Sequence, residues 1–166
     1  EGLPGGKVTL VNGQWPADEK VREAVGGGYD LILSKNTLKR GYIHPEREAD
    51  PKQLVHLGVT DEEFIKAAFD ALKPGRLLVI YNLSPAPAKE GEPYKPWADG
   101  RCPFTMAKFQ QAGFRIVTFD TDDSGAARDM GRALGWDEQG MDLQNDLFAT
   151  VTMLWKPVPV SGSVAK

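Results

Sequence analysis

The sequence is poor in the residues that build covalent and metal frameworks, with one cysteine, Cys102, and two histidines among 166 residues. A lone cysteine excludes an internal disulfide framework and a cysteine-based metal site. We expect Cys102 to be a small buried apolar side chain rather than a nucleophile. The sequence shows no apolar run of membrane-spanning length and no signal-peptide pattern. These absences favour a cytoplasmic protein without a membrane partner.

An excess of positive charge is also lacking. The net charge is −3 at pH 7, the isoelectric point is near 5.4, and the 20 Lys and Arg residues are scattered along the chain. This pattern argues against nucleic acid as a partner. The length and the hydrophobic fraction of 41% fit one globular domain with a substantial core.

Strand-like and helix-like segments alternate along the chain. Runs rich in apolar and β-branched residues predict strands at 7–12, 29–33, 76–82, 114–120 and 147–155. Helices are predicted between them, at 16–25, 60–72, 104–112 and 123–134. The clearest of these helices begins after Thr60, with Glu63 completing a capping box. The alternation predicts an α/β fold with a parallel sheet and right-handed crossovers.

Ser34, Lys35 and Asn36 directly follow the apolar strand at 29–33. Ligands of open parallel sheets bind beyond the carboxyl ends of the strands, so these polar side chains are predicted to meet a ligand. The alternative is a solvated turn in which Ser34 and Asn36 act as caps.

Two long polar loops follow central strands of the predicted sheet. The loop at 84–103 is rich in Pro and Gly and carries Tyr94, Trp97, Asp99 and Arg101. These residues can cover the substrate as a lid, or the aromatic ones can simply pin the loop to the body of the protein. The loop at 39–59 adds further residues that are predicted to line the substrate side, Arg40, Tyr42 and His44.

His44 is the first candidate for a catalytic base, because histidine titrates near neutral pH. The alternative is an exposed loop histidine without a chemical role. The same region holds several side chains of metal-binding type, His44, Glu46, Glu48, Asp50 and His56. Their spacing matches no metal-ligand template, so no metal site is expected.

Several segments, in order, resemble the second half of a class I S-adenosylmethionine-dependent methyltransferase. They are "YDLILSKNTL", then an amphipathic helix leading into "LKPGRLLVIYN", and finally "GFRIVTFD" and "LFATVTMLW". The resemblance covers 7–156, with Arg76 where the family has a second glycine. It implies a Rossmann-like, mostly parallel sheet with an antiparallel last strand, S-adenosylmethionine as cofactor, and methyl transfer to a small-molecule substrate. The expected organisation is a partial methyltransferase-like domain at 1–156 and a flexible tail at 157–166.

The resemblance also implies roles for individual residues. The segment at 7–12 would match the family's third strand, followed by the residues that flank the adenine, Asn12, Gly13, Gln14 and Trp15. An amide offers both a donor and an acceptor to the adenine edge, and an indole can stack on the ring.

Ser34, Lys35 and Asn36 would then lie beside the methionine end of the cofactor. Methyl transfer proceeds largely by holding the nucleophile and the methyl carbon in line. A base such as His44 is needed only if the acceptor must lose a proton.

Two features of the family are missing before residue 7. One is the glycine-rich turn after the family's first strand, and the other is the acidic residue that ends its second strand. The family's sheet order is 3-2-1-4-5-7-6, so without its first two strands the segment at 29–33 becomes an exposed edge. We therefore expect a C-terminal fragment of a methyltransferase-like protein. The alternative is a non-catalytic Rossmann-like binding or assembly module, whose exposed edges pair with another chain, for example in a homodimer.

Overall fold

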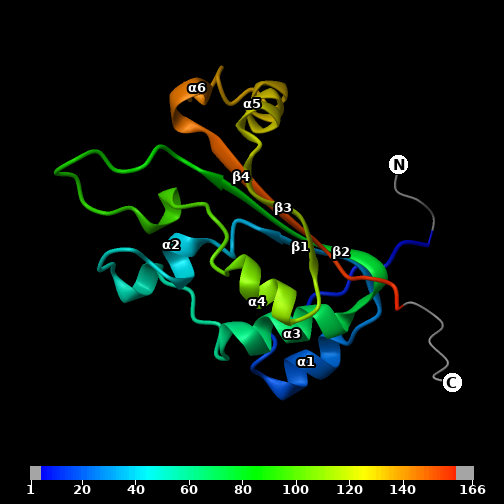
Figure 1. Ribbon diagram of the computed structural model, residues 1–166. Helices are drawn as coiled ribbons and strands as arrows, with labels where there is room; N and C mark the ends of the chain where they lie inside the picture. The colour runs from blue at the N-terminus through cyan, green and yellow to red at the C-terminus, as the bar shows by residue number, and fades with distance from the viewer. Residues whose placement is uncertain (1–4, 160–166) are drawn as a thin grey trace, which may run out of the picture.

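Four strands form one open sheet in the order β1-β2-β4-β3 in the computed structural model, which describes residues 5–159 (Figure 1). They are β1 (Tyr29–Lys35), β2 (Leu72–Ser84), β3 (Arg115–Asp122) and β4 (Phe148–Trp155). β1 pairs with β2 in parallel, and β4 runs antiparallel to both β2 and β3. Three strands therefore point one way and the last points the other. This order agrees with the 4-5-7-6 part of the sheet that the family resemblance implied, and the predicted Rossmann-like α/β fold is confirmed.

Helices connect the strands and occupy the loops. The α-helices are α1 (Glu19–Val25), α2 (Arg40–Ile43), α3 (Asp61–Ala71), α4 (Met106–Gln111), α5 (Ser124–Ala133) and α6 (Leu143–Asp146). Two short 3-10 helices lie in the loops, η1 (Pro51–Gln53) and η2 (Pro96–Ala98). Within residues 5–159, no helix combines the length and apolarity that a bilayer crossing requires.

The N-termini of α3 and α1 are capped by side chains. Thr60 Oγ1 accepts a hydrogen bond from Glu63 N at 3.2 Å, and Glu63 Oε2 accepts one from Thr60 N at 2.8 Å, which is the predicted capping box. Asp18 Oδ1 accepts from Lys20 N at 2.9 Å. Because Asp18 is the cap, α1 begins at Glu19 rather than at residue 16, where its start was predicted.

The main core lies between one face of the sheet and the helices α3 and α4. Ile65 of α3 and Phe109 of α4 are 1% and 0% exposed, and both belong to the same cluster as Leu78 of β2 and Leu154 of β4. Leu78 and Leu154 are direct partners in the β2–β4 register, so they present one continuous apolar surface to the helices.

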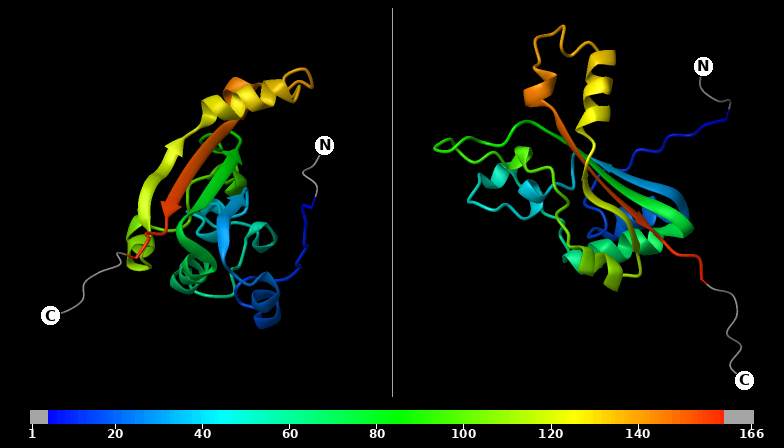
Figure 2. Two further views of the ribbon diagram at one scale, coloured as in Figure 1. Left: turned by 90° about the vertical axis from the view of Figure 1, so that its right-hand side faces the viewer. Right: turned by 45° about the horizontal axis from the view of Figure 1, so that its top comes forward.

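β1 forms one edge of the sheet, as predicted. Ile32 packs against the main core. Because side chains alternate along a strand, Leu31 and Leu33 point to the opposite face, where they are 52% and 57% exposed. The same face is covered farther along the sheet, where α5 and α6 pack on Ala149, Tyr81 and Leu83 (Figure 2).

The predicted strand at 7–12 is wrong. This segment has no regular structure, and Val8 and Leu10 are 86% and 93% exposed. A strand is stabilised by hydrogen bonds and side-chain pairs from a neighbouring strand, and among the described residues this segment has no such neighbour.

Other boundaries differ by a few residues. β1 extends through Ser34 and Lys35, and β2 begins at Leu72, because the predicted turn at 73–75 continues the strand. Gly75 N donates to Lys156 O at 2.7 Å, which ties this extension to the chain after β4. The helices α2 and α6 were not predicted. Most of the predicted tail, 160–166, lies outside the described residues.

Candidate functional site

The loops that follow β1 and β2 meet at one edge of the sheet and are joined by Asn82 of β2. Asn82 is 1% exposed, and its Nδ2 donates to the carbonyl oxygens of Leu38 at 2.8 Å and Gly100 at 2.9 Å. Thr150 Oγ1 of β4 donates to the same Gly100 carbonyl at 2.6 Å. One buried amide therefore holds both loops in place.

A buried lysine ties the same two loops together. Lys39 is 4% exposed, and its Nζ donates to Leu83 O at 2.5 Å and to Trp97 O at 3.1 Å. Burial lowers the pKa of this ammonium group, because the charged form loses its hydration. Lys39 was not among the predicted site residues, since lysine is rarely buried and nothing local distinguishes it from Lys35.

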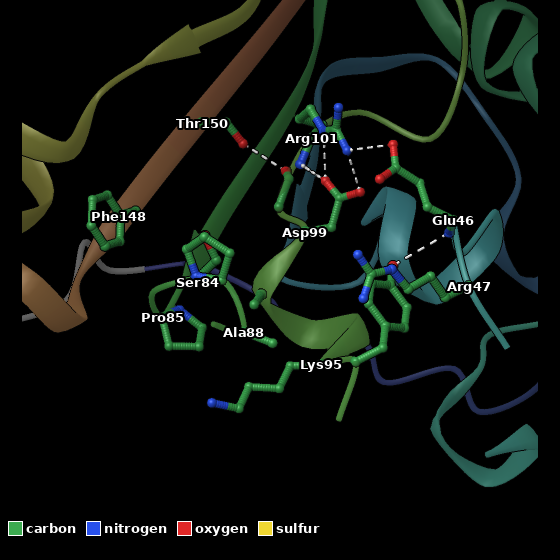
Figure 3. A pocket seen from close by; sticks show the side chains of 14 residues that line it. Glu46, Arg47, Ser84, Pro85, Ala88, Lys95, Asp99, Arg101, Phe148 and Thr150 are labelled. Atoms are coloured by element: carbon green, nitrogen blue, oxygen red, sulfur yellow. Dashed lines mark hydrogen bonds and ion pairs between the residues drawn. The ribbon is translucent and has the colours of Figure 1, made fainter. Parts of the chain in front are cut away.

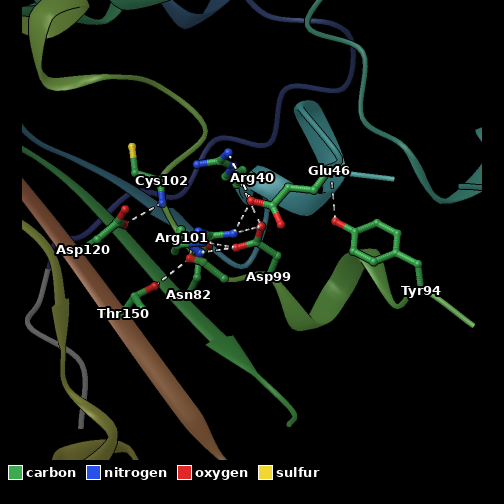
Figure 4. A network of polar contacts seen from close by, with 10 residues as sticks. Arg40, Glu46, Asn82, Tyr94, Asp99, Arg101, Cys102, Asp120 and Thr150 are labelled. Carbon is green, nitrogen blue, oxygen red and sulfur yellow. Dashed lines mark hydrogen bonds and ion pairs between the residues drawn. The ribbon is translucent and has the colours of Figure 1, made fainter. Parts of the chain in front are cut away.

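An ion-pair network gathers several predicted substrate residues around Glu46 (Figure 4). Arg101 Nη2 lies 2.7 Å from Asp99 Oδ2 and 2.9 Å from Glu46 Oε1. Arg40 Nη2 lies 3.2 Å from the same Glu46 oxygen, and Glu46 N donates to Tyr94 Oη at 3.4 Å. The hydrogen bonds to Asp99, and then those to Glu46, raise the pKa of Arg101. No local sequence signal assigns Glu46 to this site.

This network forms one wall of a pocket of about 390 Å³, which we call the loop pocket (Figure 3). Its lining includes the predicted substrate residues Tyr94, Asp99 and Arg101. Ser84 and Thr150 contribute from the ends of β2 and β4, and Phe148 closes the pocket from β4. The volume lies in the range typical of small-molecule sites.

The remaining predicted substrate residues and His44 do not line the loop pocket. Tyr42 has its ring centroid 5.4 Å from Lys39 Nζ, and burial raises the pKa of its phenol. Trp97 is 37% exposed. His44 Nε2 lies 3.0 Å from both carboxylate oxygens of Asp61, beside a separate hollow that also includes Cys102. The structure thus places the candidate base outside the loop pocket, in a hollow that it shares with Arg40.

A second pocket, of about 570 Å³, adjoins the carboxyl end of β1, and we call it the strand-end pocket. It brings together predicted cofactor residues that lie far apart in the sequence, Gly13, Gln14, Trp15, Ser34 and Lys35. Gln14 Nε2 donates to His56 O at 2.5 Å, which holds the N-terminal segment against the loop after β1. The Trp15 ring packs edge-on against Phe64 of α3, with ring centroids 5.4 Å apart.

Asn12 and Asn36 do not line the strand-end pocket. Asn12 is exposed in the irregular N-terminal segment. Asn36 continues the pairing of β1 with β2, because its N donates to Tyr81 O at 3.0 Å and its Oδ1 accepts from Leu83 N at 2.7 Å. It adopts a left-handed backbone conformation with φ of 62°, which asparagine tolerates better than most residues.

The strand-end pocket fits one end of S-adenosylmethionine. Trp15 lines this pocket, and its Nε1 is buried without a hydrogen-bond partner among the described residues, so a small movement of the indole would give an adenine ring nitrogen a donor. Gln14 retains a carbonyl oxygen that can accept from the adenine amino group. In contrast, no Asp or Glu lines this pocket to bind the ribose hydroxyls. The residues present therefore fit the adenine and supply no carboxylate for the ribose.

Cys102 lies beneath the loops and is inert as a nucleophile. It is 5% exposed, and burial raises the pKa of its thiol to about 12, so the thiolate is scarce at neutral pH. Its N donates to Asp120 Oδ1 at 2.6 Å. Across residues 5–159, no three His, Cys, Asp or Glu side chains gather closely enough to hold a metal ion.

Asp120→Asn is expected to stabilise the protein at neutral pH by up to about 1 kcal/mol. This gain is smaller than for a fully buried carboxylate, because Asp120 is partly exposed to solvent. Burial raises the pKa of Asp120 above its ordinary value of 3.8. The protonated carboxyl therefore favours the folded state below pH 3.8, and this contribution is lost as the pH rises through the folded pKa. Asparagine keeps an oxygen for Cys102 N without the charge.

Denaturant unfolding of both proteins between pH 3 and pH 7 measures this difference. The advantage of Asp120→Asn should be absent at the acidic end and grow as the pH rises. Asp129→Asn, on the exposed side of α5, is the matched control and should show no such growth. A destabilised Asp120→Asn protein at pH 7 would show that the ionised carboxylate is favourable in the fold.

The sequence matches no protein-family model and no curated protein. Solved structures with a similar fold include the cyclase SpnF, with 16% identity and a TM-score of 0.40. Others are the Haemonchus contortus phosphoethanolamine N-methyltransferase 2 in complex with S-adenosyl-L-methionine, with 9% identity and a TM-score of 0.40, and StiE O-MT, with 13% identity and a TM-score of 0.35. The matches cover 80%, 78% and 78% of this chain and 51%, 34% and 44% of those chains. This chain thus spans about half or less of their length.

Proposed function

We propose that this chain forms the acceptor-side part of an S-adenosylmethionine-dependent methyltransferase. The observation that carries the proposal is the strand-end pocket, in which Gln14 and Trp15 meet the carboxyl end of β1. The strand order β1-β2-β4-β3 supports it, because it puts this pocket at the position where a Rossmann-like sheet binds its ligand. Ser34 and Lys35 would lie beside the methionine end, and the partners of the ribose would be supplied by residues other than those that line this pocket.

The described residues would contribute by positioning. The loops held by Asn82 and Lys39 fix the loop pocket beside the ends of β2 and β4, where a methyl acceptor would bind. Fixing the acceptor in this way removes much of the entropic cost of an in-line displacement. His44 would serve as a base only for an acceptor that reaches the hollow beside Asp61.

Calorimetric titration of S-adenosylhomocysteine into the natural full-length protein tests this function. Micromolar binding is expected, and Gln14→Ala should weaken it about fivefold through the loss of one hydrogen bond. Gln144→Ala, an amide on the exposed side of α6, is the matched control and should leave the affinity unchanged. Absence of binding by the folded protein would reject the methyltransferase and favour the non-catalytic alternative.

A non-catalytic assembly module is the second candidate, because β1 is the edge of the sheet that residues 5–159 form and carries two exposed leucines, Leu31 and Leu33. Unprotected edges of this kind suit strand addition or homodimer formation. Light scattering at several protein concentrations distinguishes a homodimer from a monomer.

A further inference from the structure

Apolar side chains, among them two aromatic rings, form part of the lining of the loop pocket. Phe148, Tyr94 and Pro85 are among the lining residues. The Arg128 guanidinium, which does not line the pocket, lies 5.3 Å from the Phe148 ring centroid and stabilises the position of that ring. Aromatic rings contact other rings favourably in edge-on or offset geometry. A volume of about 390 Å³ leaves space for a small ring compound rather than for a polymer segment.

The Ser84 hydroxyl is the polar group at the base of this pocket. Ser84 is 8% exposed, and its Oγ makes no hydrogen bond to another described residue. A Cβ at position 100 would lie 3.0 Å from Ser84 Oγ, so the glycine there keeps the hydroxyl accessible. This hydroxyl is therefore free to bond a ligand that brings its own hydrogen-bonding group.

The charges of the pocket do not cancel. Arg101 and Arg40 are balanced by Asp99 and Glu46 in the ion-pair network. Two further cations line the pocket, Arg47 and Lys95, and Lys95 is paired with Glu92 at 3.1 Å. Arg47 makes no ion pair with any of the described residues. The Arg47 guanidinium is therefore available to pair with an anionic group of the ligand.

We propose that the loop pocket binds a small aromatic molecule that carries a carboxylate, with the carboxylate at Arg47 and a polar ring substituent at the Ser84 hydroxyl. Tyr94 and Phe148 contact the ring from two sides of the pocket. The binding site stands on its own, and only the identification of this molecule as the methyl acceptor rests on the proposed methyltransferase function.

Nuclear magnetic resonance titration of the protein with para-hydroxybenzoate tests the proposal, with the neutral para-hydroxybenzamide as the matched ligand. Amide signals of Ser84, Gly100 and Thr150 should shift. The carboxylate should bind about fivefold more tightly than the carboxamide, as expected for one partly exposed ion pair. Arg47→Gln should abolish this preference. Arg132→Gln, an arginine on the exposed side of α5, should preserve it.

Ser84→Ala should weaken the binding of both ligands without changing the preference between them. Equal affinity of the wild-type protein for the two ligands, binding that leaves Ser84 and Gly100 unshifted, or absence of binding would each overturn the proposal. No cofactor is present in these titrations. Binding of para-hydroxybenzoate without binding of S-adenosylhomocysteine would reject the methyltransferase function and retain the aryl carboxylate site. Binding of S-adenosylhomocysteine without binding of para-hydroxybenzoate would retain the function and reject the site.

Discussion

Gly41→Ala is expected to destabilise the protein by about 2–3 kcal/mol and to disrupt the loop pocket, because the added methyl group overpacks a backbone contact. A Cβ at Gly41 would lie 1.9 Å from the carbonyl oxygen of Pro96 and 2.7 Å from its carbonyl carbon. This contact joins α2 to η2, and Gly41 N also donates to Asp99 O at 3.3 Å. Since the clashing atoms belong to the backbone, a change of rotamer cannot relieve them.

Urea unfolding of Gly41→Ala and of a matched glycine variant measures the effect. Gly125→Ala makes the same chemical change in α5, where an added Cβ meets nothing within 4 Å. It should be neutral or stabilising by up to about 1 kcal/mol, as alanine is the better helix former. Equal stability of the two variants would show that the α2–η2 contact yields easily and does not fix the pocket.

Asn82→Ala should cost about 2–3 kcal/mol, because two buried carbonyl groups lose the same donor. Nδ2 is bonded to Leu38 O and Gly100 O, and both loops of the candidate site depend on it. Thr150 still donates to Gly100 after the substitution, so the loop after β1 should loosen more than the loop after β2.

The unfolding midpoint reports the stability loss, and amide hydrogen exchange near residues 38 and 100 reports the loosening. Asn145→Ala is the control, since its side chain bonds only to exposed Asp142 and should contribute less than about 0.5 kcal/mol. If Asn82→Ala kept wild-type exchange rates in both loops, Asn82 would not be the residue that joins them.

Local signals in the sequence were sufficient for most of the fold. Thr60 and Glu63 mark the start of α3 through a capping box that needs only adjacent residues. The apolar runs of β2 and β4 reflect burial that does not depend on the details of the neighbours. The run of β1 also predicted a strand, although Leu31 and Leu33 are exposed in the structure. The prediction of a strand at 7–12 was wrong for the opposite reason, because a strand requires a neighbouring strand and the sequence pattern alone does not show whether one is present.

The site was less accessible to sequence reasoning. Strand-end geometry predicted a ligand at Ser34 and Lys35, and the family resemblance added Gln14 and Trp15. The structure places all four in the lining of one pocket, and their role in binding stays a prediction. The residues that hold the loops, above all Lys39, depend on tertiary contacts between loops that are remote in sequence. Glu46 joins the network only because the fold of the 39–59 loop brings it to Arg101.

The indole N–H signal of Trp15 offers the most direct measurement of the proposed cofactor placement. The four tryptophans of the chain give separate indole signals in a heteronuclear spectrum of the natural full-length protein. On titration with S-adenosylhomocysteine, the Trp15 signal should shift to saturation, because its Nε1 is the buried donor without a partner beside the strand-end pocket. Saturable binding with Trp15 unmoved, while Trp97, Trp136 or Trp155 shifts instead, would contradict this placement.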